Sequence, residues 1–154
     1  MNFDFSDEQN LLRDEVHKYL VKESPLAVAR EVMEAGGTHS ARVWQGLVDL
    51  GATSLMLPGD CGGSGLGALE LCVVAEEVGR QLGAVPLAST LYLASQVLLL
   101  GASAAQQQRW LAPVDGGAIG AFAAPLDGVL AGVVLPRFAG GRLSGSVDLV
   151  ADGA

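Results

Sequence analysis

A chain of 154 residues can bury a core without metals or disulfides, and 50% hydrophobic but only 5% aromatic residues favour helices packed through Leu, Val and Ala. The net charge of −8, with only 9 Lys and Arg residues, argues against a nucleic-acid surface. Cys61 and Cys72 lack metal-ligand spacing and the N-terminus lacks a secretory apolar segment. We therefore expect a reduced, cytoplasmic protein without a metal site, and the polar residues within 85–100 argue against a membrane span.

Capping signals predict the first helices of the chain. Ser6 and Gln9 form an S-x-x-Q capping box, which predicts a helix that begins directly after Ser6. Ser24 followed by Pro25 predicts the N-cap and the first residue of a second helix. Gly36 supplies the left-handed residue that ends this helix.

The helical pattern continues through the middle of the chain. Ser40 predicts the N-cap of a third helix that ends at Gly51. Apolar and charged residues recur at helical spacing over residues 68–82, with Gly83 as the expected C-cap. Together these signals predict a mainly α-helical bundle.

The residue pattern changes after the last predicted helices. One helix is expected from residue 89 or 90 to Gly101, and Ser103 caps a shorter one that Pro113 closes. Glycines then punctuate short apolar runs that predict strands at 118–123, 129–135 and 143–150. We therefore predict a helical domain over residues 1–113 and a short, incomplete β segment over residues 114–154.

A glycine-rich loop raises the question of dinucleotide binding. Residues 63–68 satisfy G-x-G-x-x-[GA] and open a helix. However, residues 58–62 separate these glycines from the preceding apolar run, and residues 83–95 contain no acid at the distance that a ribose contact needs. We favour a structural loop whose glycines take positive φ.

No isolated side chain predicts catalysis. His17 and His39 have no Cys, Asp or Glu at ligand spacing, and we expect both at the surface. Glu76 and Glu77 point about 100° apart on a helix, which predicts a solvated or salt-bridged face. Cys61 has no recognisable base and receives no role. The two tryptophans have apolar neighbours at helical spacing and are expected in the core or an interface: Trp44 and Trp110.

Taken in order, three passages resemble the acyl-CoA dehydrogenase family. Residues 3–13, FDFSDEQNLLR, resemble the family's opening F-x-[FL]-[ST]-[DE]-E-Q-x-x-[LI]-[RK]. Residues 44–80 resemble its L-x-x-x-G…P-x-x-x-G-G-x-G…E-E-[LIV] block. Residues 101–113 are similar to its G-[ST]-x-x-Q-[KR]-x-x-[WY]-L-P passage. The set of three is specific, although each passage alone is weak.

The resemblance implies a helical N-terminal domain, a middle β-domain and a C-terminal helical domain, with FAD between the β-domain and helices. It implies dehydrogenation between the α and β carbons of an acyl-CoA, in fatty acid or steroid side-chain catabolism, with an electron-transfer acceptor. The catalytic carboxylate of the family lies downstream of the part resembled here. The expected partners are homo- or hetero-oligomeric subunits of the same kind, with neither nucleic acid nor membrane.

Within this resemblance, the helices present would contribute a wall to the acyl-chain pocket. The stretch from residue 87 to 95 combines apolar side chains with small residues that allow close approach. Ordinary core packing explains the same pattern equally well. The candidate pocket residues are Leu87, Ala88, Leu91, Tyr92 and Ser95.

The sequence departs from the family where flavin contacts are expected. In the family's T-E-P-x-x-G-S-D segment, Ala123 and Ala124 replace the Thr and Glu. In its G-x-K-x-[WFY]-[IV]-[TS]-[NG]-G segment, Leu149 and Ala151 replace the aromatic residue and the hydroxyl. A methyl group cannot replace a hydroxyl bonded to the flavin without losing that hydrogen bond.

Three hypotheses follow. The chain is a dehydrogenase subunit or fragment that contributes to an FAD site completed by further polypeptide. Alternatively, it is a non-catalytic, flavin-poor subunit that packs against an active partner, which the alanines favour. A third reading is a helical interaction module without any link to flavin chemistry.

Overall fold

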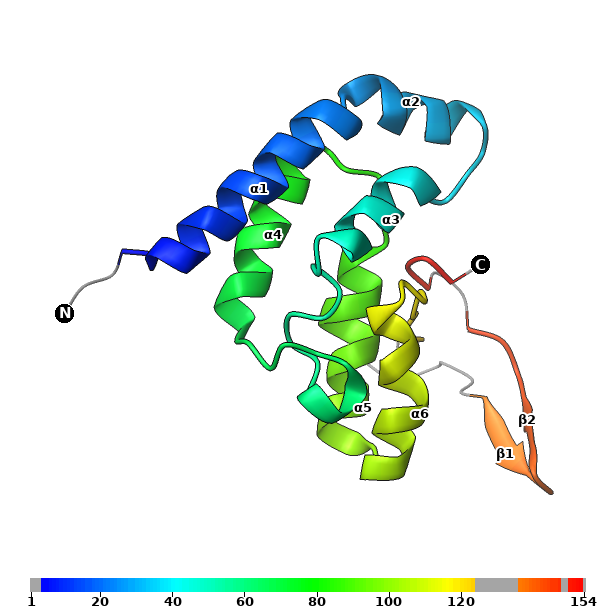
Figure 1. The fold of residues 1–154 in the computed structure, drawn as a ribbon. Coiled ribbons are helices and arrows are strands. Elements are labelled where there is room, and N and C mark those ends of the chain that lie inside the picture. The colour runs from blue at the N-terminus through cyan, green and yellow to red at the C-terminus, as the bar shows by residue number, and fades with distance from the viewer. Residues whose placement is uncertain (1–3, 124–135, 148–149, 154) are drawn as a thin grey trace.

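The computed structural model describes residues 4–123, 136–147 and 150–153 and confirms a mainly helical fold (Figure 1). The helices are α1 (Asp7–Glu23), α2 (Leu26–Glu34), α3 (Ala41–Asp49), the 3₁₀ turn η1 (Gly59–Cys61), α4 (Ala68–Arg80), the π-helical η2 (Ala88–Ala94), α5 (Ser95–Gly101) and α6 (Ala104–Asp115). The described strands are β1 (Arg137–Ala139) and β2 (Arg142–Ser144).

Helix α1 lies beside α4 along one edge of the bundle (Figure 1). The predicted capping box starts it: Ser6 Oγ accepts from the Gln9 N–H at 3.2 Å, and Gln9 Oε1 accepts from the Ser6 N–H at 2.9 Å. Val16 and Leu20 are fully buried toward the rest of the bundle. The remaining faces of α1 are largely exposed, as its amphipathic pattern requires.

The predicted start of the second helix is wrong by one residue. Pro25 is extended, with ψ of 158°, and occupies the N-cap position, so α2 begins at Leu26. Ser24 instead ends α1, where its N–H donates to the Leu20 carbonyl at 2.8 Å. The connection between the helices is so short that Ser24 completes the preceding helix and cannot cap the following one.

Helices α2 and α3 end as predicted in left-handed glycines, Gly36 (φ 65°) and Gly51 (φ 77°). Helix α4 differs, because its left-handed residue is Leu82 (φ 48°) and not Gly83. The Gly83 N–H reaches back to the Val78 carbonyl at 2.9 Å, which is the outer hydrogen bond of a Schellman motif. The helix therefore ends one residue earlier than its glycine suggests.

The core joins α1, α3, α4, η2 and α6 with the turn at residues 52–57. Its largest fully buried side chains include Leu20, Leu47, Leu57, Leu71 and Leu111. Trp44 belongs to this core, with 4% of its surface exposed. Trp110 does not, because it is 53% exposed, so the expectation of core packing fails for it while an interface role stays a prediction.

The end of the bundle departs from prediction in two details. Ser103 precedes α6 and its N–H donates to Gln106 Oε1 at 2.9 Å, as the capping signal predicts. Pro113 lies inside α6, which continues to Asp115 before Gly117 takes the left-handed conformation (φ 92°). The helical stretch that precedes α6 also starts earlier than expected, because its helical backbone begins at Ala88.

Within the described residues, the predicted β segment forms one two-stranded sheet. Residues 118–123 form no regular strand, and the run expected at 129–135 lies outside the described residues. Strands β1 and β2 pair antiparallel, with Phe138 opposite Leu143, around Gly140 and Gly141, which both have positive φ. Both strands are exposed along their length. Of the predicted strand at 143–150, the part within Arg142–Ser144 forms, residues 145–147 form no strand, and residues 148 and 149 lie outside the described residues.

Candidate functional site

The segment predicted to face an acyl chain is built as a π-helix. The Ser95 N–H donates to the Thr90 carbonyl, five residues earlier, and the Ser95 hydroxyl donates to the same carbonyl at 2.7 Å. Pro86 precedes the segment and is itself fully buried. Wide π turns of this kind are rare and occur frequently at functional sites. The bifurcated bond holds the end of η2 in a fixed position.

The five candidate pocket residues do not share one open face. Leu87, Leu91 and Ser95 are buried, and the two leucines belong to the hydrophobic core. Ala88 is exposed on the opposite side. Tyr92 is half-buried, and its hydroxyl donates to the Leu71 carbonyl at 2.9 Å. The pocket assignment stays a prediction, and core packing accounts for the two leucines.

Buried side chains of the bundle hold the backbone that follows α6. Trp44 Nε1 donates to the Gly117 carbonyl at 2.7 Å. The hydroxyl of Thr90 donates to the Gly120 carbonyl at 3.3 Å and accepts from the Gly120 N–H at 3.2 Å. An added Cβ at Gly120 would approach the Ala94 methyl to 2.8 Å. The path of residues 117–120 along η2 therefore depends on a glycine and on one buried hydroxyl.

A second chain segment reaches the same helix. Asp152 has a positive φ of 52°, and its Oδ2 accepts from the buried Ser89 hydroxyl at 2.6 Å. Ser89 and Thr90, neighbours in η2, thus hold two segments that are more than thirty residues apart in sequence. No local sequence pattern could indicate the pairing of Ser89 with Asp152, because the two residues are 63 positions apart.

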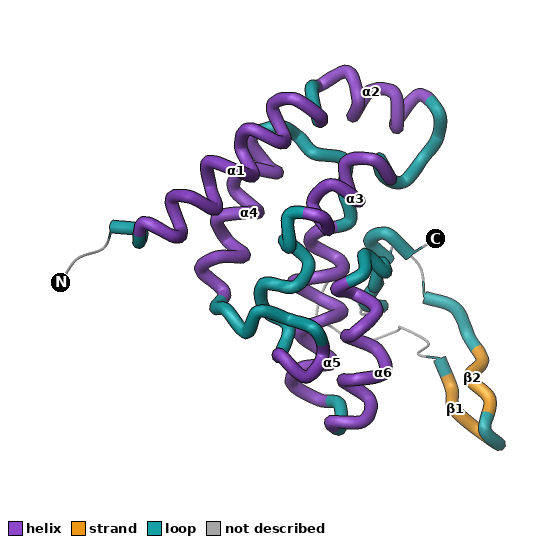
Figure 2. Tube along the Cα trace, in the orientation of Figure 1, coloured by secondary structure: helices purple, strands orange, loops and turns teal. Residues whose placement is uncertain are grey.

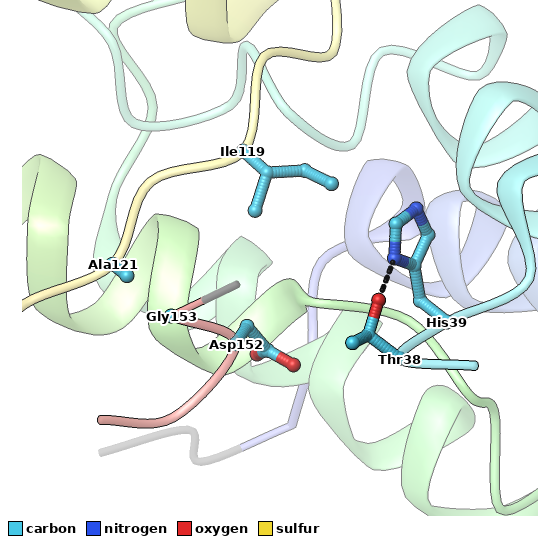
Figure 3. A pocket seen from close by; sticks show the side chains of 6 residues that line it. All are labelled: Thr38, His39, Ile119, Ala121, Asp152 and Gly153. Carbon is cyan, nitrogen blue, oxygen red and sulfur yellow. Dashed lines mark hydrogen bonds between the residues drawn. The ribbon is translucent and has the colours of Figure 1, made fainter. Parts of the chain in front are cut away.

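A small pocket lies where these two segments meet the loop before α3 (Figure 3). Its volume is about 240 Å³, and it is lined by Thr38, His39, Ile119, Ala121, Asp152 and Gly153. His39, expected at the surface, is half-buried with its Nδ1 3.0 Å from Thr38 Oγ1. The pocket thus contains one imidazole and one carboxylate, and Asp152 is already engaged by Ser89.

The positions expected to bind flavin carry no hydroxyl. Ala123 and Ala151 are both exposed, and their methyl groups can neither donate nor accept a hydrogen bond. The other two altered positions, Ala124 and Leu149, lie outside the described residues. Ala123 and Ala151 therefore do not fit the flavin contacts that the family resemblance implies, and no reaction step through a flavin follows from them.

The glycine-rich loop is structural, as predicted, although within residues 63–68 only Gly65 takes a positive φ, of 63°. This loop belongs to the connection between α3 and α4 (Figure 2). The backbone N–H groups of Ser64, Gly65 and Leu66 donate to carbonyls in the turn at residues 54–57, at 2.9, 2.9 and 2.7 Å. The Gly67 N–H, at the start of α4, donates to Glu70 Oε2 at 2.9 Å. A phosphate-binding loop needs these N–H groups free, so dinucleotide binding here is excluded.

The acidic pair on α4 divides into two environments. Glu76 is exposed and pairs with Arg80 at 2.5 Å, as the prediction of a salt-bridged face requires. Glu77 is also salt-bridged, as predicted, but it is not solvated, because its side chain is only 3% exposed. Its Oε2 lies 2.8 Å from Nδ1 of His17, which is 51% exposed, and its Oε1 lies 3.3 Å from Arg80 Nε.

This cluster has a structural explanation. A buried carboxylate requires charged or hydrogen-bonding partners, and His17 and Arg80 supply them from α1 and α4. Prediction missed the partner of His17 because Glu77 is 60 residues away in sequence. Cys61 is buried, and desolvation, reinforced by Asp60, raises the pKa of its thiol, which disfavours the thiolate form.

The helical arrangement and the segment held along η2 define an N-terminal helical domain of the acyl-CoA dehydrogenase type. Residues 6–118 match the family described as Acyl-CoA dehydrogenase, N-terminal domain. Acyl-CoA dehydrogenase FadE28 of Mycobacterium tuberculosis is 42% identical over 108 residues, covering 67% of this chain and 31% of that protein. The chain belongs to the acyl-CoA dehydrogenase family.

Solved structures agree on the fold. The ChsE4-ChsE5 complex from Mycobacterium tuberculosis matches with a TM-score of 0.69 and 28% identity, over 76% of this chain and 32% of that chain. Butyryl-CoA dehydrogenase from Megasphaera elsdenii matches with a TM-score of 0.69 over 80% of this chain and 33% of its own, and at 23% identity it shows the fold alone. The chain thus spans about a third of these relatives. None of the described helices is long and apolar enough to cross a bilayer.

Proposed function

We propose that this chain is an acyl-CoA dehydrogenase-like subunit or fragment that contributes to FAD-dependent α,β-dehydrogenation of an acyl-CoA thioester. The match of residues 6–118 to the family's N-terminal domain carries the proposal. The chain's own part would be a helical wall beside the acyl group, built on the stretch from residue 87 to 95, in which Leu87 and Leu91 anchor the helix in the core. The hydrogen bond from Tyr92 to the Leu71 carbonyl fixes this wall against α4.

The proposal assigns the other parts of the reaction to further polypeptide. No catalytic carboxylate is assigned within this chain, and FAD would be bound with the remaining fold or a partner. We further propose a cytoplasmic homo- or hetero-oligomer with subunits of the same family that passes electrons to an electron-transfer acceptor. The similarity to one chain of a two-component complex supports the oligomer.

A second function is favoured by a specific observation. Ala123 and Ala151 place methyl groups where the family has hydroxyls, and both are exposed. This pattern supports a non-catalytic, flavin-poor subunit that completes a heteromeric dehydrogenase. Such a subunit would retain the helical wall and leave the cofactor to its partner.

Flavin absorbance at about 450 nm distinguishes the two functions. The chain is purified alone and after co-expression with the proteins encoded by neighbouring genes. Flavin that co-purifies with the chain alone would contradict the flavin-poor subunit. Flavin that appears only in a complex with a partner would support the flavin-poor subunit. A complex whose partner is equally active without this chain would contradict any contribution of the chain to dehydrogenation.

Restoring the hydroxyls sharpens the experiment. The double variant Ala123→Thr/Ala151→Thr is expected to raise the flavin content of whichever species binds it, because two hydrogen bonds of about 1 kcal/mol each are regained. Ala105→Thr on the exposed part of α6 is the matched control. Equal flavin content in all three proteins would show that these positions do not contact the cofactor.

A further inference from the structure

An apolar groove unrelated to the predicted acyl wall lies between α5, α6 and the segment that follows α6. Its volume is about 600 Å³, within the range of about 300 to 1,000 Å³ that small-molecule sites occupy. We call it the Trp110 groove, and its main lining residues are Leu98, Arg109, Trp110, Pro113, Val114 and Ile119. None of the five candidate pocket residues of η2 and its flanks lines it.

The groove exposes apolar surface that a folded chain normally covers. Trp110 is 53% exposed and Ile119 is 41% exposed, while Val114 is 5% exposed and lies deeper. The apolar surface continues past Leu98 and Trp110 into a shallower depression that includes Val97, which is 43% exposed. Apolar patches of this kind on a soluble domain mark binding sites.

A single charge breaks the apolar lining. The guanidinium of Arg109 stacks over the Trp110 ring, with its central carbon 4.9 Å from the ring centroid. Within the described ranges, no carboxylate forms an ion pair with Arg109, although the chain carries a net charge of −8. Stacking occupies the face of the guanidinium and leaves its N–H groups at the edge able to donate in a bidentate manner.

From this arrangement we propose that the Trp110 groove binds an amphipathic carboxylate, with its apolar body along Leu98, Val114 and Ile119 and its head group on Arg109. Charge complementarity argues for an anion, because among the described residues Arg109 has its stacking contact with Trp110 but no carboxylate partner. The volume of the groove, about 600 Å³, argues for a small molecule. This site does not depend on the function proposed above, since it uses neither the η2 wall nor the flavin positions.

The test compares three ligands with the same ten-carbon chain and different heads: decanoate, 1-decanol and decyltrimethylammonium, each below its micelle-forming concentration. Titration calorimetry measures binding to the full chain, and tryptophan emission reports on the groove. Trp44 is 4% exposed, so a shift of the emission to the blue is expected from Trp110. Decanoate should bind with one-to-one stoichiometry at least about tenfold more tightly than the cationic ligand.

Two variants locate the binding. Arg109→Gln should weaken decanoate about tenfold and change decanol less than about twofold, because only the head-group contact is lost. Arg30→Gln, at an exposed arginine of α2, is the matched control and should change neither affinity. Ile119→Glu should abolish decanoate binding by placing a like charge in the groove, and circular dichroism verifies that each variant is folded.

Several results would overturn the proposal. Equal affinities for decanoate and decyltrimethylammonium, an unchanged decanoate affinity in Arg109→Gln, or no binding at millimolar decanoate would each do so. An emission shift that follows protein concentration, together with dimers in sedimentation, would show instead that a second copy of the chain covers the groove.

Discussion

The helical bundle and the segment after Gly117 are stabilised by different means. The bundle buries a continuous apolar core in which Leu20, Leu47 and Leu111 are fully inaccessible. In the described part of the later segment, Phe138 is 73% and Leu143 is 72% exposed, and β1 and β2 bury neither face. What positions the segment is a small set of hydrogen bonds from bundle side chains.

The two regions therefore respond differently to substitution. The hydrophobic core consists of residues between Val16 and Val114, whereas residues 117–120 and 152 follow paths set by Trp44, Thr90 and Ser89. Positions 123 and 151 lie close to these attachment points but outside the core. Substitutions there are expected to leave the packing of the bundle unchanged.

Identical substitutions in the two regions give the largest expected contrast. Leu47→Ala should lower the free energy of unfolding by about 3 kcal/mol, because it removes a fully buried side chain and leaves a cavity. Leu143→Ala should change it by less than about 0.5 kcal/mol, since the leucine is mostly exposed. Urea denaturation followed by circular dichroism measures both. Similar losses in the two variants would show that the hairpin shares the core.

The next largest effect on stability is expected from removing the hydrogen bonds between Thr90 and Gly120. Thr90→Val keeps the shape of this fully buried side chain and removes its two hydrogen bonds with Gly120. The free energy of unfolding should fall by about 1 to 2 kcal/mol, and the Gly120 amide hydrogen should exchange faster. Thr38→Val, at an exposed threonine, is the control. If both variants are equally stable, the hydroxyl of Thr90 does not hold the segment.

Local signals explain why the bundle was predictable from sequence. Capping boxes and left-handed glycines act within a few residues, so Ser6, Gly36, Ser40 and Gly51 took their predicted roles. The wrongly predicted helix ends arose where two local signals compete for one residue. Ser24, for example, completes α1, so Pro25 occupies the N-cap position of α2. Such competitions displace a helix end by one or two residues without changing the fold.

Contacts between distant residues were not predictable in this way. The pairing of His17 with Glu77 spans 60 residues, and that of Ser89 with Asp152 spans 63, so no local pattern encodes either. The candidate pocket residues show the same limit, because helical spacing could not tell that Leu91 is buried while Ala88 is exposed. A candidate site therefore emerges only when the packing of η2 against the later segment is known.

The end of α4, where the sequence predicted Gly83 as the C-cap, offers a stabilising substitution at Leu82. Leu82 occupies the left-handed position after α4, which costs a residue with a Cβ about 1 to 2 kcal/mol. Leu82→Gly should raise the melting temperature by a few degrees, for a gain of about 1 kcal/mol after the added flexibility of the unfolded chain. The exposed leucine, at 65%, contributes little burial to oppose this. Leu82→Ala keeps the Cβ and should give no gain; a gain in that control would contradict the explanation by strain.

The smallest expected effect concerns pH and the start of α4. Hydrogen bonds from the Gln9 side chain at 2.8 Å and from the Gly67 N–H at 2.9 Å lower the pKa of Glu70. A carboxyl whose pKa is lower in the folded state adds stability above its unfolded pKa of about 4.3, and loses it as pH falls toward the folded value. Glu70→Gln keeps a side-chain acceptor at the cap but cannot titrate, so it should be slightly less stable than the native chain at neutral pH. That deficit should shrink below pH of about 4, as measured by urea unfolding across the pH range. A deficit for Glu70→Gln that is equally constant with pH would show that the charge of Glu70 does not stabilise the contact between α1 and α4.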